Sequence, residues 1–316
     1  MAKIEREDIQ TISQHSNWSK SGVSKALLHH IYPDKTAWQR FLSLLFLGLG
    51  LSFCIAGIIF FFAFNWSQMH KFFKLGLVEA LIVLVFLSIY FFRAKPFIKK
   101  SLLTVASVLV GVLYAVFGQV YQTGANAYDL FLVWTLFITV WAVVSNFSLL
   151  WLVYIALINI TIVLYAEQVS LNWDAMFLTI LLFGVNALFS VLFIALPKLT
   201  RLKAYPTWFT NVLILAATTI GTIGVSGGIM DKKDASFYVL LVFVLLFFCA
   251  GLWYGKITRN LFYLSVIPFG AIIVFCAFLL NISEDAGMLF VIGLFIIASI
   301  SVLIKTLLNL QKKWTG

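Results

Sequence analysis

Apolar residues dominate the chain from Phe41 onward, in runs of about 20 residues that are separated by short polar segments. A run of this length, wound as an α-helix that rises about 1.5 Å per residue, crosses a hydrocarbon core of about 30 Å. We therefore expect about ten membrane-spanning helices. The predicted spans are residues 41–64, 74–92, 101–120, 129–145, 149–166, 174–196, 207–229, 236–255, 260–280 and 286–306.

Residues 1–40 follow a different pattern, because charged and histidine side chains interrupt every apolar stretch. Weak helical spacing of apolar residues recurs up to Ile31, and Pro33 ends it. The pattern predicts a small cytoplasmic helical segment over residues 1–40, ahead of a transmembrane bundle over 41–306. Residues 307–316 are expected to form a cytoplasmic tail.

The composition changes the class of protein that these runs can belong to. Hydrophobic residues make up 62% of the chain and charged residues 11%, whereas soluble domains are roughly 45–50% apolar and about 25% charged. A water-soluble fold is excluded, and so is a disordered chain, which needs few apolar residues and many charges. The fold class is therefore all-α, a polytopic helical membrane protein.

The basic residues indicate how the chain is threaded. If consecutive spans alternate, 18 of the 22 Lys and Arg residues fall on one side of the membrane, together with both ends of the chain. Positively charged loops stay in the cytoplasm, so both termini are expected there, beside anionic lipid headgroups. The net charge of +10 follows from this topology, and no nucleic-acid partner is expected.

Glu79 is the one carboxylate well inside an apolar run. Ionisable groups at membrane depth are costly and usually face protein or water. Glu79 is either a proton- or cation-binding group or a structural partner for a lysine or a polar group on a neighbouring helix. The structural alternative is favoured.

The segment from Gly118 to Asp129 is the most polar stretch between two spans. Its amides and its carboxylate predict either a ligand site or an ordered polar turn, in which Asp129 caps the following helix. The candidate ligand-binding residues, with Glu79, are Gln119, Tyr121, Gln122, Asn126 and Asp129. Gly124 provides backbone freedom at the turn.

Other polar and small residues lie inside the predicted spans. Asn159, Asn186 and Asn211 are single amides, more typical of interhelical hydrogen bonds than of ligand binding. Gly224 and Gly228 favour close helix packing, and Pro268 is expected to kink its helix, with a role in packing or gating.

The motifs of common intramembrane and nucleotide-dependent enzymes are missing. The sequence has no HExxH, GxSxG or Walker-type glycine loop and no paired intramembrane aspartates. Its three cysteines are scattered and form no metal-ligand spacing. We expect no enzyme activity, metal or cofactor.

Several of these features occur together in a known family. Phe64-Asn65-Trp66, Lys74, and the segment from Gly118 to Gly124 followed by Tyr128, Leu130 and Trp134 resemble a family of predicted bacterial multi-pass membrane proteins, domain of unknown function 2157. The resemblance is firmest over residues 1–165. It implies a location in the bacterial inner membrane and implies no activity.

Two functions are compatible with the sequence. The first is a transporter or flippase of a small solute or lipid, with an outward-facing polar site between the first four spans. The second is a non-catalytic membrane scaffold or sensor that acts through the basic N-terminal segment. The sequence does not name protein partners.

Overall fold

The computed structural model describes most of the chain after Trp66 and parts of what precedes it. The described stretches are residues 15–30, 66–91, 95–122, 124–170, 172–200, 204–231, 234–283 and 285–315, with single positions and short runs of two or three residues between Ile9 and Phe64. The chain divides into two compact units, residues 1–74 and residues 75–316.

The first unit contains a short polar helix, α2 (Lys20–His30). The backbone N–H of Gly22 donates to the hydroxyl of Ser19 at 3.2 Å, which satisfies one of the free donors at the helix start. A single 3₁₀ turn, η1 (Trp66–Gln68), precedes α4. Most of the predicted span 41–64 lies outside the described residues.

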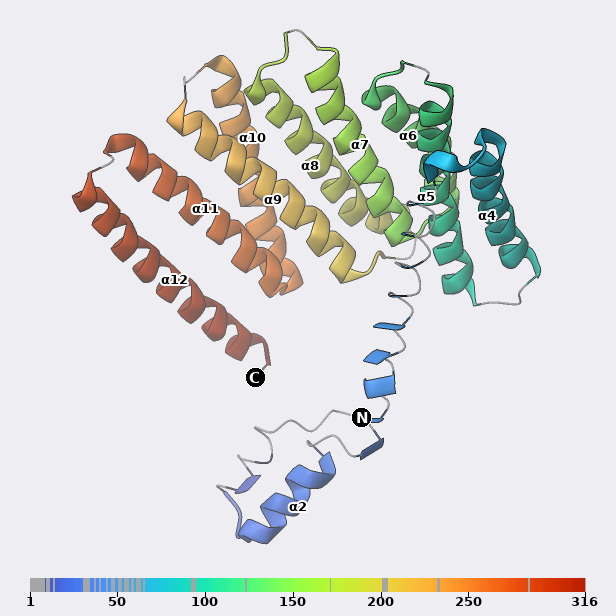
Figure 1. Ribbon diagram of the computed structural model, residues 1–316. Coiled ribbons are helices and arrows are strands. Elements are labelled where there is room, and N and C mark those ends of the chain that lie inside the picture. Colours follow the sequence, from blue (N-terminus) through green and yellow to red (C-terminus); the bar gives the residue numbers. More distant parts are fainter. Residues whose placement is uncertain are drawn as a thin grey trace. The chain divides into compact units, whose positions relative to one another are not determined.

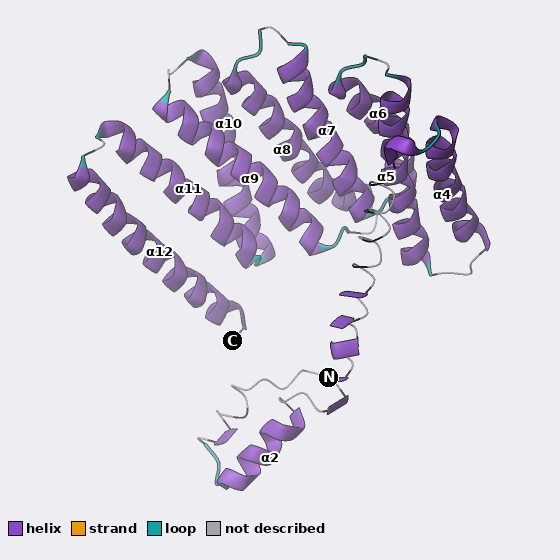
Figure 2. Cartoon of the chain, in the orientation of Figure 1, coloured by secondary structure: helices purple, strands orange, loops and turns teal. Residues whose placement is uncertain are grey.

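Nine helices of the described residues are long and apolar enough to cross a membrane, and no strand is present among these residues (Figure 2). They correspond to the second through the tenth predicted spans. The helices are α4 (Lys71–Phe91), α5 (Pro96–Tyr121), α6 (Ala127–Ser145), α7 (Ser148–Gln168), α8 (Ala175–Thr200), α9 (Thr207–Met230), α10 (Ala235–Thr258), α11 (Leu261–Ile282) and α12 (Ala286–Thr315).

Local residues explain where several helices begin and end. Pro96 opens α5, where its missing N–H costs nothing. Between α6 and α7 the chain turns through Asn146, whose φ of 45° is left-handed, and Phe147. Asparagine tolerates that conformation better than most residues. The last helix, α12, continues through residues 307–315 of the predicted tail.

Consecutive helices of the second unit run in opposite directions (Figure 1). α5, α6 and α7 pack together, α7 contacts α8, and α8, α9 and α10 form the next group. α11 lies on α9 and α10, and α12 lies on α11. α9 is the central helix. In its most apolar 18-residue stretch 56% is buried, against 6% in the corresponding stretch of α12.

Small residues allow the close approach of α9 to its neighbours. Gly224 lies against Thr179 of α8 and Leu240 of α10, and Gly228 lies against Phe237 of α10. The surrounding core contains Phe183, Val225, Ile229, Phe237, Leu240, Val244, Phe248 and Ile267. Because lipid tails are as apolar as these side chains, close packing supplies the cohesion between helices.

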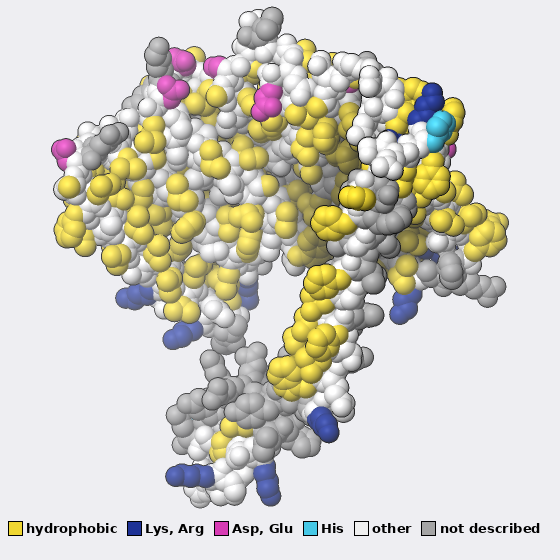
Figure 3. All heavy atoms as spheres, viewed as in Figure 1, with side chains coloured by type: hydrophobic (Ala, Val, Ile, Leu, Met, Phe, Trp, Pro, Cys, Tyr) yellow, Lys and Arg dark blue, Asp and Glu magenta, His cyan; other side chains and the backbone are white. Residues whose placement is uncertain are grey.

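The two ends of the second unit carry opposite charges (Figure 3). Its described acidic residues lie on α4 and near the ends joined by the α5–α6, α7–α8, α9–α10 and α11–α12 turns: Glu79, Asp129, Glu167, Asp174, Asp231, Asp234 and Asp285. The other end carries the basic residues Lys95, Lys99, Lys100, Lys256, Arg259, Lys305, Lys312 and Lys313. We call these the acidic end and the basic end.

Candidate functional site

The turn from α5 to α6 lies at the acidic end and contains most of the candidate residues. α5 ends at Tyr121, after which Gln122 takes a left-handed conformation with φ 45°. Gly124 follows with φ 65°, a region that glycine enters without steric cost. Asn126 then precedes the first residue of α6. Two left-handed residues thus reverse the chain within a short turn.

Asn126 and Asp129 hold the start of α6. The backbone N–H of Asn126 donates to Oδ2 of Asp129 at 3.0 Å, and the backbone N–H of Asp129 donates to the carbonyl oxygen of Asn126 at 3.1 Å. The carboxylate also lies at the positive end of the helix dipole, which stabilises it. Asp129 therefore has the capping role that the sequence offered as one alternative.

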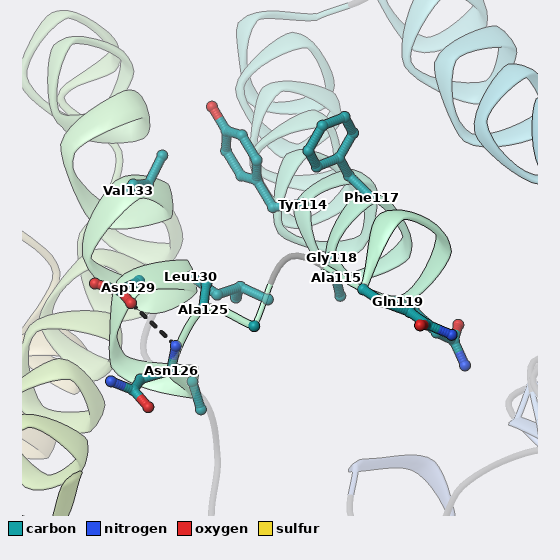
Figure 4. Close-up of a pocket in the computed structure, with 13 residues that line it drawn as sticks. Tyr114, Ala115, Phe117, Gly118, Gln119, Ala125, Asn126, Asp129, Leu130 and Val133 are labelled. Atoms are coloured by element: carbon teal, nitrogen blue, oxygen red, sulfur yellow. Dashed lines mark hydrogen bonds between the residues drawn. The ribbon is translucent and has the colours of Figure 1, made fainter.

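A cavity of about 440 Å³ lies between α5 and α6 beside this turn. The residues of the turn and its flanks that line it are Gln119, Gln122, Gly124, Asn126 and Asp129. Figure 4 shows Gln119 on α5, with its side chain directed away from Asn126 and Asp129, which lie across from it at the start of α6. Their polar ends point in different directions, so they form a rim and do not converge on one atom.

Apolar side chains form the walls of the cavity, and none of them is among the candidate site residues predicted from the sequence. They include Tyr114 and Phe117 of α5 and Leu130 and Val133 of α6 (Figure 4). A signal was available in their spacing. Tyr114 and Phe117 in α5 are three residues apart, as are Leu130 and Val133 in α6, so each pair shares one helix face.

Two of the candidate residues lie outside this cavity. Tyr121 packs on Phe117, with ring centroids 4.7 Å apart, and does not line the cavity. Glu79 lies on the exposed surface of α4 and does not line it either. The structure thus brings together four of the six candidates, all from the single turn and its flanking helices.

The start of α6 is also tied to α7. The backbone N–H of Tyr128 donates to Oε1 of Gln168 at 3.0 Å, and the rings of Tyr128 and Tyr165 make an edge contact at 5.5 Å. Trp173, before α8, contacts Tyr165 in turn. An aromatic row therefore follows the acidic end from α6 to α8.

The intramembrane amides form bonds between helices, as expected. Nδ2 of Asn186 donates to Oδ1 of Asn159 at 2.6 Å, and Nδ2 of Asn260 donates to Oδ1 of Asn211 at 3.4 Å. Pro268 lies within α11, which runs on both sides of it as one helix. Within the described residues, no group of three His, Cys, Asp or Glu side chains could hold a metal.

Comparison with known proteins finds a family model that covers the polar turn. Residues 18–151 match the family model "Predicted membrane protein (DUF2157)". The resemblance noted from the sequence is thereby confirmed, over a stretch that includes α4, α5, α6 and the cavity. No curated protein and no solved structure matches the chain. The chain is thus a polytopic helical membrane protein, and the family description supplies no activity.

Proposed function

We propose that this protein is a transporter or flippase that accepts a small polar solute, or the polar headgroup of a lipid, between α5 and α6. The observation that supports the proposal is the cavity of about 440 Å³ at the acidic end, with an amide and carboxylate rim and apolar walls. Cavities of about 300–1,000 Å³ with a few polar groups are typical of small-molecule sites.

The proposed orientation has the acidic end outside and the basic end in the cytoplasm of a bacterial inner membrane. The charge difference between the two ends supports it, because Lys and Arg are retained on the cytoplasmic side. The cavity then opens outward, and the basic end lies beside anionic headgroups.

Reconstituted vesicles test the transport proposal with two probes. Bleaching of a fluorescent phospholipid by external dithionite measures lipid flip-flop, and light scattering after addition of a small polyol measures solute entry. We expect one of the two rates to exceed that of protein-free vesicles. Rates equal to those of empty vesicles for both probes would reject the proposal.

A pair of valine variants in α6 connects the activity to the cavity. Val133→Trp places an indole in the cavity that Val133 lines and is expected to abolish the added rate. Val140→Trp is the matched control, because Val140 is 65% exposed and lines no part of it. Equal rates in the two variants would show that transport does not use this cavity.

A Glu79→Gln variant tests whether Glu79 takes part in coupling. A transport rate equal to that of the wild-type protein at every pH would show that it does not.

The alternative function is a scaffold or sensor that works through the N-terminal segment. Residues 1–74 form a compact unit of their own, and α2 exposes Lys20 and Lys25. Deletion of residues 1–37 is expected to abolish any cross-linked partner complex while the remaining helices still insert. Full phenotypic rescue by the deleted chain, with no partner found, would reject this alternative.

A further inference from the structure

A second cavity, of about 480 Å³, lies between α7, α8 and α9. Its lining is apolar except for Asn159 of α7 and Asn186 of α8, and no charged side chain lines it. Both amides lie near the middle of their helices, about 14–17 Å from the acidic end at 1.5 Å per residue. The cavity is therefore within the hydrocarbon core, remote from the polar turn of α5 and α6.

The two amides leave one acceptor and one donor unused. Asn186 is 3% exposed, and its Nδ2 donates to Oδ1 of Asn159 at 2.6 Å and to the carbonyl oxygen of Leu182 at 2.8 Å. Nδ2 of Asn159 donates once, to the carbonyl oxygen of Ile155 at 2.7 Å. An amide has two N–H donors and one acceptor oxygen. Among the described residues, nothing donates to Oδ1 of Asn186 or accepts the second N–H of Asn159.

An unused donor beside an unused acceptor defines the chemistry of a complementary ligand. A hydroxyl group both donates and accepts, so one alcohol can satisfy both amides. An ionised group is excluded, because no opposite charge is available and burial of an unpaired charge is very costly. The remaining lining consists of Leu, Ile, Val and Ala side chains, which suit a hydrocarbon chain.

The cavity is accessible from the lipid phase. Ile160 of α7 and Val212 of α9 line it and are 39% and 41% exposed, so its edge lies on the outer surface of the second unit. We infer that the α7–α8–α9 cavity binds a long-chain alcohol, with the hydroxyl group on Asn159 and Asn186 and the chain along the apolar wall. This inference does not depend on transport through the α5–α6 cavity.

Photolabelling in vesicles tests the inference directly. The probe is hexadecanol with a diazirine in its chain, and the matched probe is the same diazirine alkane without the hydroxyl group. For the wild-type protein we expect labelling by the alcohol to exceed labelling by the alkane about fivefold, because each new hydrogen bond adds a modest affinity. The labelled peptides should come from α7, α8 or α9, and unlabelled hexadecanol should compete where the ionised hexadecanoate does not.

Variants of the amides provide the second arm. Asn159→Leu with Asn186→Leu removes both partners at once and is expected to abolish the preference for the alcohol while alkane labelling persists. Asn211→Leu is the control, since Asn211 also belongs to an interhelical amide pair but does not line the cavity. Equal labelling of the wild-type protein by both probes would overturn the inference and indicate an ordinary acyl-chain groove. Alcohol labels that map to other helices, or an unchanged preference in a double variant that retains its fold, would overturn it as well.

Discussion

The hydroxyl groups within the helices differ in whether they have a hydrogen-bond partner. The hydroxyl of Thr161 in α7 donates to the carbonyl oxygen of Leu157 at 2.7 Å. The hydroxyls of Thr218, Thr222 and Ser226 in α9 are buried and make no hydrogen bond to the described residues. A buried polar atom without a partner costs about 1–3 kcal/mol, so these residues are expected to destabilise the contact between α9 and α11.

Replacement of one of these hydroxyls by a methyl group should therefore stabilise the protein. Thr222→Val keeps the side-chain shape and is expected to raise the free energy of unfolding by about 1 kcal/mol. Thr161→Val, the control, exchanges a satisfied hydroxyl and should change it by less than about 0.5 kcal/mol. Thermal unfolding in detergent measures both. A lower stability for Thr222→Val would show that its hydroxyl has a partner, such as water.

Tyr205, in the turn between α8 and α9, predicts a loss of stability at alkaline pH. Burial raises the pKa of Tyr205 above its usual 10.0, and an interaction with Trp151 opposes part of that rise. The hydroxyl also donates to Oδ1 of Asn146. Tyr205 therefore ionises at a lower pH in the unfolded chain than in the folded protein. The contribution of its neutral hydroxyl to folding stability is complete below about pH 10 and is lost as the pH rises through the folded pKa.

The measurement is the thermal stability of wild type and Tyr205→Phe between pH 8 and pH 11. Wild type should lose more stability than Tyr205→Phe across this range. Tyr90→Phe is the control, because Tyr90 is 79% exposed. Parallel curves for wild type and Tyr205→Phe would contradict the assignment.

At the scale of the helices, the sequence predicts position well and neighbours poorly. The second through the tenth predicted spans differ from the observed helices by a few residues at most ends, because the length of an apolar run is set by the bilayer. Helices such as α7 and α10 are apolar on all sides, so periodicity does not indicate which face meets which helix. The positions of glycines such as Gly224 determine instead which face of α9 packs against its neighbours.

The candidate site was predictable to a similar extent. Gln119, Gln122, Asn126 and Asp129 share one turn and are therefore close in sequence as well as in space. Glu79 was predicted to belong to the same site as these residues. Whether it does depends on how α4 packs, which no local sequence pattern indicates. Its place on an exposed surface of α4 is a property of tertiary packing.

Two neighbouring glycines of α9 test the packing explanation. A Cβ at position 224 would overlap Thr179 and Leu240, whereas one at position 227 meets nothing within 4 Å. Gly224→Ala is expected to lower the free energy of unfolding by about 1–3 kcal/mol. Gly227→Ala should leave it unchanged or raise it by up to about 1 kcal/mol, because alanine favours helix. Equal effects in detergent-based unfolding would refute close packing at Gly224.

At the scale of the whole molecule, the separation of charge is the dominant property. The described acidic and basic side chains of residues 75–316 are segregated by end, although the helices that carry them alternate in direction. A shift of the threading by one span would mix the two sets. The separation of the charges therefore supports this assignment of the helices to the two ends, and the proposed orientation is based on it.

Fusion reporters check that orientation in a bacterial host. A green fluorescent protein after residue 316 should fluoresce, and alkaline phosphatase at the same position should be inactive, because both would lie in the cytoplasm. The same enzyme fused after Met230, at the acidic end, should be active. An active phosphatase after residue 316 would reverse the orientation and turn the α5–α6 cavity toward the cytoplasm.

The sparse burial of α12 has a mechanical consequence. Within the described part of the chain this helix contacts little besides α11, and only 6% of its most apolar window is buried. A load applied to the carboxyl end would meet little resistance from protein and would peel α12 into the aqueous phase on its own. The central helix α9, held on three sides, would yield later and together with its neighbours. Under such a load the helices should leave the membrane one after another, beginning with α12.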